Sequence, residues 1–249
     1  MEFRDRRVLI TGAGGIYGRW FAEAFAAEGA RLLLSDNRAA ALAETVQALG
    51  PDHARTLTHA TELLDEASIL DLAALVRREW GAADIVLNNA GIYPGRMLLE
   101  TPTAEYDAIL GVNARAVFIL TREMAKLMLA AGVKGSVINV SSAASRRMRP
   151  SRVLYCSSKT LLERLTKGFA LELAPHGIRV NAIEPGFAAG SAVSPLSQAH
   201  IAEMTAGIPL GRLPTAADAA EAVKFLCSAR ASFITGAVLA VEGGNSLRA

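Results

Sequence analysis

The chain has few cysteines, little net charge and no long apolar run. Its two cysteines, Cys156 and Cys227, are too few for a disulfide framework, and no metal-ligand spacing is present. The 26 basic and 24 acidic residues leave a net charge of +2, which argues against a nucleic-acid surface. No apolar stretch approaches the roughly 20 residues of a membrane-spanning helix, and the N-terminus lacks the pattern of a signal peptide. We therefore expect a soluble, cytoplasmic protein that binds no metal, nucleic acid or membrane.

What the sequence does contain is a regular alternation of apolar runs and Ala/Leu/Glu-rich segments. Hydrophobic residues make up 51% of the chain, which is ample for a buried core. Nearly continuous apolar strands are typical of a parallel sheet that helices cover on both faces. Repeated strand–helix units with short links are typical of a doubly wound α/β fold. We predict one Rossmann-type domain over residues 1–249, with a parallel sheet of about seven strands.

The boundaries of these elements follow from the same alternation. The predicted strands are 7–11, 31–35, 55–59, 85–88, 136–140, 179–183 and 238–241. The predicted helices are 19–28, 39–49, 66–80, 103–129, 154–174 and 216–229. The segment 187–213 is rich in Ala, Ser, Gly and Pro and is the least regular. We interpret it as a mobile flap that closes over a site.

A glycine-rich stretch, TGAGGIYG, lies between the first predicted strand and the first predicted helix. This layout is typical of a phosphate-binding loop, because a helix N-terminus offers free N–H groups and a partial positive charge. Asp36 follows at the end of the second predicted strand. A carboxylate there accepts hydrogen bonds from the ribose hydroxyls of NAD and repels the 2′-phosphate of NADP. Taken alone, the pattern is equally consistent with a plain loop and a strand-end turn residue.

Tyr155 and Lys159 lie one turn apart on a predicted helix and therefore share one of its faces. A nearby ammonium favours the phenolate and lowers the pKa of a tyrosine from its usual value of about 10. Such a tyrosine can accept a proton from an alcohol as hydride leaves the carbon. Alone, this spacing is more often an exposed pair of side chains.

Several further motifs, in order along the chain, make it resemble the short-chain dehydrogenase/reductase family over nearly its whole length. They are NNAG, VNARAVF, VINVSS, YCSSK, IRVNAIEPG and FITGAVLAVEGG. The resemblance implies that Tyr155 is the general acid/base and that Lys159 lowers its pKa and binds the nicotinamide ribose. It also implies that Ser142 orients the substrate oxygen, with Ser141 the weaker candidate, and that Asn113 completes a proton relay.

The resemblance also implies an NAD site. The implied cofactor-binding residues are Gly12, Gly15, Ile16, Tyr17, Gly18, Asp36, Glu62, Leu63, Asn89, Ala90, Gly91, Tyr155, Lys159, Pro185, Gly186 and Ala188. The chain departs from the family pattern at three places. Ile16 stands where the family has a glycine, although a one-residue slip would supply Gly15. Glu62-Leu63 replaces an Asp-Val pair that contacts adenine, and Gly190, next to Ser191, replaces a frequent threonine.

The sequence indicates the substrate less clearly than it indicates the cofactor. Four arginines, Arg146, Arg147, Arg149 and Arg152, precede Tyr155, and guanidinium groups bind carboxylates or phosphates bidentately. A solvated loop or a subunit contact is the favoured alternative for these arginines. Tyr93, Met97, Met148 and Phe187 form a possible apolar wall that suits a neutral ketone or secondary alcohol. Of all these, the residues that we predict to contact substrate are Ser142, Tyr93, Arg146 and Phe187.

We therefore expect an NAD(H)-dependent oxidoreductase that interconverts a small secondary alcohol and a ketone. One alternative is a 3-ketoacyl-carrier-protein reductase, against which Asp36 counts because such enzymes mostly use NADP. Another is a catalytically silent NAD-binding regulator, against which the complete Ser142, Tyr155 and Lys159 set argues. Family members commonly form tetramers through two long helices and the C-terminal strand, so we expect a homotetramer, with a dimer as the alternative.

Overall fold

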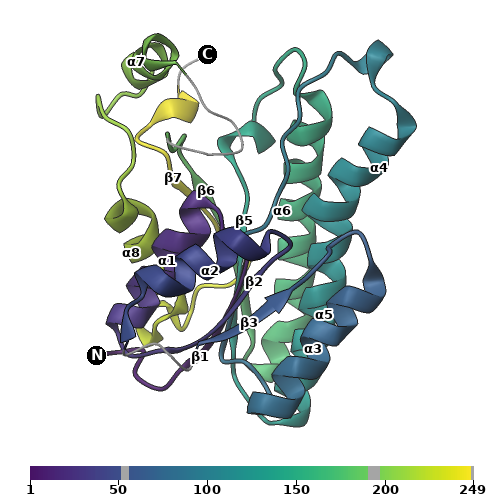
Figure 1. Ribbon diagram of the computed structural model, residues 1–249, viewed down its shortest axis with the longest axis vertical. Helices are drawn as coiled ribbons and strands as arrows, with labels where there is room; N and C mark the ends of the chain where they lie inside the picture. The colour runs from purple at the N-terminus through teal and green to yellow at the C-terminus, as the bar shows by residue number, and fades with distance from the viewer. Residues whose placement is uncertain (52–55, 190–196, 248–249) are drawn as a thin grey trace.

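The strands of the computed structural model, which describes residues 1–51, 56–189 and 197–247, all lie in one parallel sheet (Figure 1). The seven strands have the order β3-β2-β1-β4-β5-β6-β7. Their bounds are Arg7–Thr11 for β1, Arg31–Asp36 for β2, Leu57–Ala60 for β3, Ile85–Asn88 for β4, Ser136–Val140 for β5, Arg179–Pro185 for β6 and Val238–Val241 for β7. The order reverses between β1 and β4, and ligands of such sheets bind beyond the carboxyl ends of the strands at this point. The predicted doubly wound α/β fold is confirmed.

Helices cover both faces of this sheet. Figure 1 shows α1, α2 and α8 on one side of the sheet and α3, α4, α5 and α6 on the other. The bounds are Ile16–Ala27 for α1, Ala39–Ala48 for α2, Glu66–Trp80 for α3, Thr103–Leu110 for α4, Ala116–Ala130 for α5, Val153–Leu173 for α6, Gln198–Ala206 for α7 and Ala216–Cys227 for α8. Short helical turns lie at Leu98–Glu100, Gly111–Arg115, Ala143–Ser145, Ala174–His176, Ala229–Ala231 and Asn245–Leu247.

The strands are apolar throughout because each buries both of its faces. In β1, Val8 and Ile10 pack with α1 and α8, whereas Leu9 packs with α3 and α5 on the opposite face. Successive side chains of a strand point to opposite faces, so both sets must be apolar when helices cover both. Two hydrophobic clusters result, one on each side of the sheet. Their packing fixes the positions of the strand ends.

The predicted helix over 103–129 is interrupted in the structure. Helix α4 ends at Leu110, a π-helical turn spans Gly111–Arg115, and α5 begins at Ala116. Gly111 allows a close contact, since an added Cβ would lie 2.6 Å from the Leu64 side chain. The π turn, a feature often found at functional sites, carries the buried Asn113. The prediction of one uninterrupted helix over 103–129 was therefore wrong at this point.

The segment predicted to be irregular, 187–213, contains helix α7. The Ser197 side chain caps this helix by accepting a hydrogen bond from the His200 amide at 3.2 Å. Residues 190–196 lie outside the described part of the chain, so the flap remains a prediction. Within the described ranges, every helix is too short or too polar to cross a lipid bilayer.

Candidate active site

The glycine loop joins β1 to α1 and presents an uncapped helix N-terminus. Gly15 is the N-cap of α1 in extended conformation, without a side-chain cap or an acidic residue in the first turn of this helix. The loop is closed by a hydrogen bond from the Gly15 amide to the Gly12 carbonyl at 3.1 Å. Ile16 begins the helix three residues earlier than predicted. A helix end of this kind is suited to an anion such as a pyrophosphate.

Close backbone approaches explain three of the glycines in the loop. A Cβ on Gly18 would lie 2.2 Å from the Gly12 carbonyl oxygen, so only glycine fits there. Gly12 has a positive φ of +64°, and its added Cβ would meet the Ala90 Cα at 2.7 Å. At Gly14, an added Cβ would lie 2.7 Å from the Ala41 side chain. The sequence pattern identified Gly12 and Gly18 but missed Gly14, which lies in the same glycine run.

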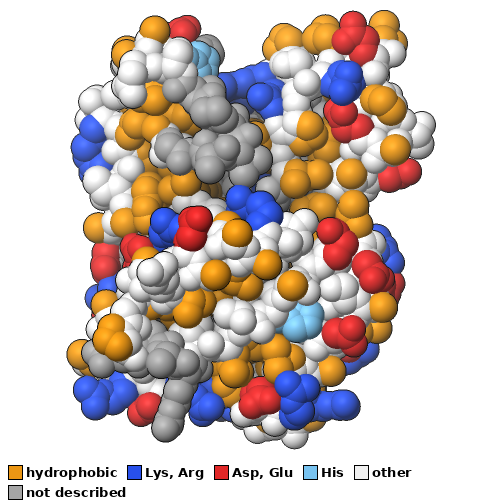
Figure 2. Space-filling view, viewed as in Figure 1, with side chains coloured by type: hydrophobic (Ala, Val, Ile, Leu, Met, Phe, Trp, Pro, Cys, Tyr) orange, Lys and Arg blue, Asp and Glu red, His pale blue; other side chains and the backbone are white. Residues whose placement is uncertain are grey.

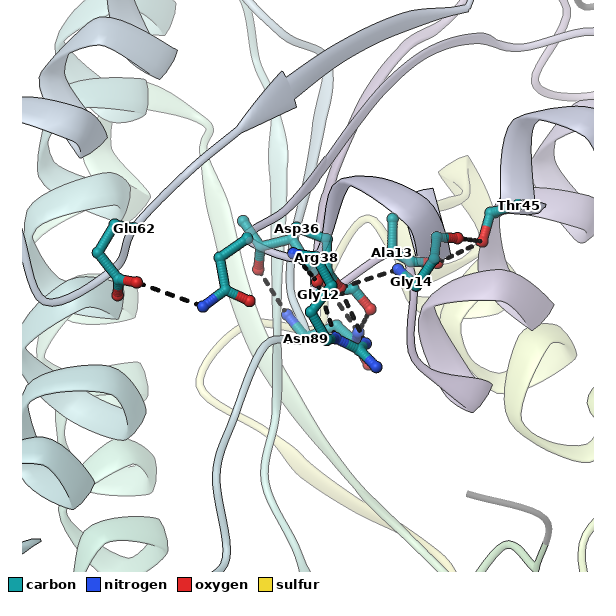
Figure 3. A network of polar contacts seen from close by, with 11 residues as sticks. Gly12, Ala13, Gly14, Asp36, Arg38, Thr45, Glu62 and Asn89 are labelled. Carbon is teal, nitrogen blue, oxygen red and sulfur yellow. Dashed lines mark hydrogen bonds and ion pairs between the residues drawn. The ribbon is translucent and has the colours of Figure 1, made fainter. Parts of the chain in front are cut away.

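Asp36 is buried and faces the glycine loop (Figure 3). Its Oδ2 accepts a hydrogen bond from the Gly14 amide at 3.0 Å. Its Oδ1 accepts from the Arg38 amide at 2.9 Å and from Arg38 Nε at 3.1 Å. The predicted ribose-binding carboxylate is thus held next to the loop and is paired with a cation. Because of this ion pair, Arg38 contributes directly to the charge at this position.

The NNAG turn after β4 is tied directly to the glycine loop. Asn89 Nδ2 donates to the carbonyls of Thr11 and Gly12 at 2.9 Å and 3.0 Å. The Thr11 hydroxyl accepts from the amides of Asn89 and Ala90 at 3.1 Å and 3.2 Å. These bonds fix the two turns that follow neighbouring strands β1 and β4 as one unit, at the point where the strand order reverses.

Ser142, Tyr155 and Lys159 converge near the ends of β5 and α6. Ser142 follows β5, and a side-chain hydrogen bond links it to Tyr155 in the first turn of α6. Lys159 is buried, its Nζ lies 5.9 Å from the centre of the Tyr155 ring, and it donates to the Val140 carbonyl at 2.8 Å. The three side chains singled out from the sequence are therefore brought together.

Burial shifts the pKa values of Tyr155 and Lys159 in the directions that favour their uncharged forms. The pKa of Tyr155 is raised, because burial of the phenolate outweighs the hydrogen bond from Ser142, which lowers it. The pKa of Lys159 is lowered to about 8 by burial, which the negative charge of Glu163 only partly opposes. From the sequence we expected Lys159 to lower the pKa of Tyr155. The protein's own groups do not produce that net shift, because desolvation dominates.

Asn113 is fully buried in the π turn and holds the backbone beyond the NNAG motif. Its Oδ1 accepts from the Ile92 amide at 2.9 Å, and its Nδ2 donates to the Ile92 carbonyl at 2.8 Å. Nδ2 also lies 3.0 Å from the Ser158 hydroxyl, which itself donates to the Tyr155 carbonyl. Gly91 lies between the Asn113 side chain and Lys159, since an added Cβ on Gly91 would be 3.4 Å from Lys159 Nζ. The amide thus connects the NNAG turn to α6, and its place in a proton relay stays a prediction.

Tyr17 joins the glycine loop to the end of β6. Its hydroxyl donates to the Gly186 carbonyl at 2.6 Å, and burial raises its pKa. The Gly186 amide in turn donates to the Val241 carbonyl at 2.9 Å, while Pro185 pairs with Val241 in the sheet. The cofactor-binding residues predicted in the first loop therefore lie next to those predicted at the end of β6.

Known proteins are similar to this chain in sequence and in fold. A family model described as enoyl-(acyl carrier protein) reductase matches residues 12–246. The sorbitol dehydrogenase of Cereibacter sphaeroides is 31% identical over 256 residues, covering 98% of this chain and 99% of that protein. The chain belongs to the short-chain dehydrogenase/reductase family.

Two solved structures of this family superpose closely on the chain. One is a 3-ketoacyl-(acyl-carrier-protein) reductase from Brucella melitensis complexed with NADH, with a TM-score of 0.87 and 34% identity. It covers 98% of this chain and 99% of its own. The other is an NAD⁺-bound xylitol dehydrogenase, with a TM-score of 0.89, 26% identity and coverage of 98% and 100%.

Of the two further departures from the short-chain dehydrogenase/reductase pattern, Glu62-Leu63 lies in the described part of the chain. Glu62 is exposed, and its carboxylate accepts from Asn37 Nδ2 at 3.3 Å and from the Leu64 amide at 3.2 Å (Figure 3). Leu63, next to it, packs partly against the α3 side of the core. Gly190 and Ser191 lie outside the described residues. Phe187 and Ala188 are partly buried just after Gly186.

The arginines before Tyr155 bond mainly to the protein itself. Arg146 pairs with the buried Glu184, its Nε donating to Oε1 at 2.9 Å. Arg147 donates to the Asn245 carbonyl, and Arg152 donates to the Tyr93 carbonyl. The role of Arg146 in binding an anionic substrate remains a prediction, and it competes with this ion pair. Glu184 was missed, because a single glutamate in IRVNAIEPG has no distinguishing signal.

An aromatic side chain lies beside Tyr155. The rings of Tyr93 and Tyr155 meet edge to face, with 6.2 Å between centroids. Met97 and Met148, predicted to form an apolar wall, are 52% and 63% exposed. Figure 2 shows the surface hollowed between the part that carries α7 and the part that carries α4, with hydrophobic side chains on the α4 flank. This open, apolar flank is a suitable approach for a substrate.

Proposed function

We propose that this short-chain dehydrogenase/reductase is an NAD(H)-dependent oxidoreductase that interconverts a secondary alcohol and a ketone. The observation that carries the proposal is the convergence of the Ser142 hydroxyl, the Tyr155 phenol and the buried Lys159 ammonium. Relatives named as sorbitol dehydrogenase and xylitol dehydrogenase act, by those names, on polyols, whose carbons bear secondary alcohols.

The residues of the first loop fit a dinucleotide. Gly12 and Gly18 keep the loop free of side chains, the first turn of α1 is uncapped, and Asp36 lies beside it. We assign the pyrophosphate to the loop, the adenosine ribose to Asp36 and the adenine to Glu62 and Leu63. Asn89, Ala90 and Gly91 would line the nicotinamide side, together with Ile16, Tyr17, Pro185, Gly186 and Ala188. When bound, the nicotinamide supplies the site that gives or takes hydride.

The protein's own groups would manage the proton and the substrate oxygen. The phenolate form of Tyr155 accepts the hydroxyl proton during oxidation, and the resulting phenol returns that proton during reduction. Ser142 donates a hydrogen bond to the substrate oxygen and so fixes its position beside the phenol. Lys159, with a pKa of about 8, is mostly protonated at neutral pH, and its charge opposes the cost that burial places on the phenolate. Asn113 keeps the backbone next to Lys159 in place.

The preference for NAD over NADP rests on Asp36. A buried carboxylate disfavours the 2′-phosphate of NADP by repulsion and by the cost of desolvating two negative charges. Arg38 acts in the opposite sense, but its guanidinium is paired with Asp36. Two further possibilities remain as alternatives. A 3-ketoacyl-carrier-protein reductase is supported by the Brucella melitensis relative, and a silent NAD-binding regulator would not need Tyr155.

A panel of polyols, hydroxy acids and aryl alcohols with NAD, followed as NADH absorbance, tests the proposal. We expect turnover of at least one secondary alcohol, with NAD preferred over NADP. Faster reduction of 3-ketoacyl thioesters with NADPH would favour the carrier-protein reductase instead. Tight NADH binding without turnover of any panel member would favour the regulator.

A further inference from the structure

We propose that Glu184 is a positioning residue that holds the serine-bearing turn after β5, so that Ser142 stays directed at Tyr155. The inference rests on the role proposed above for Ser142. Glu184 lies at the end of β6, one residue before the Pro185–Gly186 turn, and its side chain is fully buried. No step of the proposed reaction uses this carboxylate.

The carboxylate of Glu184 is held by two consecutive residues, Ser145 and Arg146. Oε1 accepts from the Ser145 hydroxyl at 2.8 Å and from Arg146 Nε at 2.9 Å. Oε2 lies 2.7 Å from Arg146 Nη2, which is an ion-pair distance, but it accepts no hydrogen bond from the described residues. A charge-assisted hydrogen bond is stronger than a neutral one, so the bond from Arg146 Nε ties the end of this turn firmly to β6.

These two donors belong to the same short turn as Ser142. The turn Ala143–Ser145 begins immediately after Ser142, whose Oγ accepts from the Ala144 amide at 3.2 Å. The Ser145 amide donates to the Ser142 carbonyl at 2.9 Å, so the turn is closed on itself. Ser145 and Arg146, at the end of the turn, therefore fix the orientation of Ser142 at its start. Glu184 binds both Ser145 and Arg146.

Helix α6 holds the turn from the opposite side. Thr160 Oγ1 donates to the Ser145 carbonyl at 2.8 Å, one residue after Lys159. Glu163, also on α6, accepts from the Ser141 hydroxyl at 2.6 Å. The turn is thus held by both β6 and α6, and of these contacts only the one between Arg146 and Glu184 is an ion pair with a fully buried carboxylate.

A buried carboxylate is costly unless it is fully paired. Burial raises the pKa of Glu184 and nearby Glu163 raises it further, whereas Ser145 and Arg146 lower it. An apolar residue at 184 would fill the same space without that cost, but it would leave the turn unheld. Because Arg146 binds Glu184, its loss would lower kcat. Loss of an arginine that binds an anionic substrate would instead raise the KM of acidic substrates.

The variants Glu184→Gln and Ser145→Ala test the inference, assayed with the secondary alcohol that reacts fastest in the panel. Ser145→Ala removes one hydrogen bond but leaves the ion pair, so it keeps the test usable if Glu184→Gln does not fold. We expect kcat to fall about ten- to a hundredfold for Glu184→Gln and several-fold for Ser145→Ala. The Kd of NADH, measured by fluorescence, should stay within about twofold, because the glycine loop is untouched.

Asp84→Asn provides a matched control. Asp84 forms a bidentate ion pair with Arg7 at the amino end of the sheet, with N–O distances of 2.7 Å and 2.9 Å. This variant should lower the unfolding midpoint and leave kcat unchanged. If Asp84→Asn lowers kcat as much as Glu184→Gln, the effect is one of general stability and the inference is wrong.

A double-mutant cycle with Ser142→Ala separates the inference from the proposed function. We expect Glu184→Gln to lower kcat less than about twofold in the Ser142→Ala background, since residues that act through one another are not additive. The same loss in both backgrounds, or a folded Glu184→Gln protein with the parent kcat, would overturn the inference. If Ser142→Ala alone has the parent activity, the role proposed for Ser142 fails instead.

Discussion

At the scale of single residues, the site is dominated by buried groups that resist ionisation. Lys159 and Tyr155 lie one helical turn apart, yet burial moves both pKa values against the charged form. Such a site is costly to fold and is poised for proton transfer, because a small change in local charge changes which form is present. This cost is measurable, and Lys159 gives the clearest case.

Lys159→Met should remove a pH-dependent part of the stability. The folded-state pKa of about 8 is below the unfolded value of 10.5, so burial destabilises the folded protein fully below pH 8. As the pH rises from 8 to 10.5, wild type should regain about 3 kcal/mol relative to Lys159→Met. Urea unfolding of both proteins across this range measures the difference. A difference that does not change with pH would contradict the assigned pKa.

Asp36→Asn should shift the cofactor preference toward NADP(H). Asparagine keeps an acceptor for the Gly14 amide but loses the charge, which releases Arg38 to meet a 2′-phosphate. We expect the ratio of kcat/KM for NADH to that for NADPH to fall about tenfold or more. The double variant Asp36→Asn/Arg38→Ala should lose the gain with NADPH. An unchanged ratio would show that this carboxylate does not select the cofactor.

At the scale of elements, the first turn of α1 depends on Gly18. Gly18→Ala would place a Cβ 2.2 Å from the Gly12 carbonyl and 2.7 Å from the Ala13 Cα, both backbone atoms. We expect a loss of about 1–3 kcal/mol in unfolding free energy, together with weaker NADH binding. Glu23→Ala, on the exposed face of the same helix, should change stability by less than about 0.5 kcal/mol. Unaltered NADH affinity in Gly18→Ala would contradict the assignment of the loop.

The elements themselves were largely predictable, because strand and helix periodicity is a local property. Strands β1, β4, β5 and β7 and helix α3 have the predicted bounds. The interruption at Gly111–Arg115 was not foreseen, since it depends on the tertiary contact of Gly111 with Leu64. Helix α7 was missed because its sequence is short, weakly amphipathic and flanked by Ser and Pro.

Prediction of the site shows the same division. Ser142, Tyr155 and Lys159 were found through motifs, and the structure brings them together. The pairing of Arg146 with Glu184 was not foreseen, because it joins residues of two strand ends that are distant in sequence. The sign of the Tyr155 pKa shift was also missed, since burial cannot be read from the spacing of Tyr155 and Lys159.

At the scale of the whole molecule, an exposed apolar groove on α4, α5 and α6 supports the predicted self-association. It is lined chiefly by Tyr106, Leu110, Phe118, Leu161 and Leu165. Tyr106, Phe118 and Leu161 are 45%, 40% and 42% exposed, and a patch of this kind is typical of an interface. The faces of α5 and α6 belong to the two long segments from which a homotetramer or dimer was expected.

Phe118→Glu/Leu161→Glu should therefore give a monomer in sedimentation velocity, whereas we expect wild type to sediment as a dimer or tetramer. Charged side chains in an apolar interface cannot be desolvated without a large cost. Leu70→Glu, on the exposed side of α3, is the matched control and should leave the wild-type mass unchanged. A wild-type protein that sediments as a monomer would contradict the proposal.

The most direct test of the account compares wild type with Tyr155→Phe in NADH formation from the best secondary alcohol of the panel. This change removes one hydroxyl group and keeps the ring that packs against Tyr93. We predict that kcat falls about a hundred- to ten-thousandfold, while the Kd of NADH changes less than about threefold. A Tyr155→Phe protein that binds NADH and oxidises the alcohol at the wild-type rate would contradict the central claim that this phenol transfers the proton.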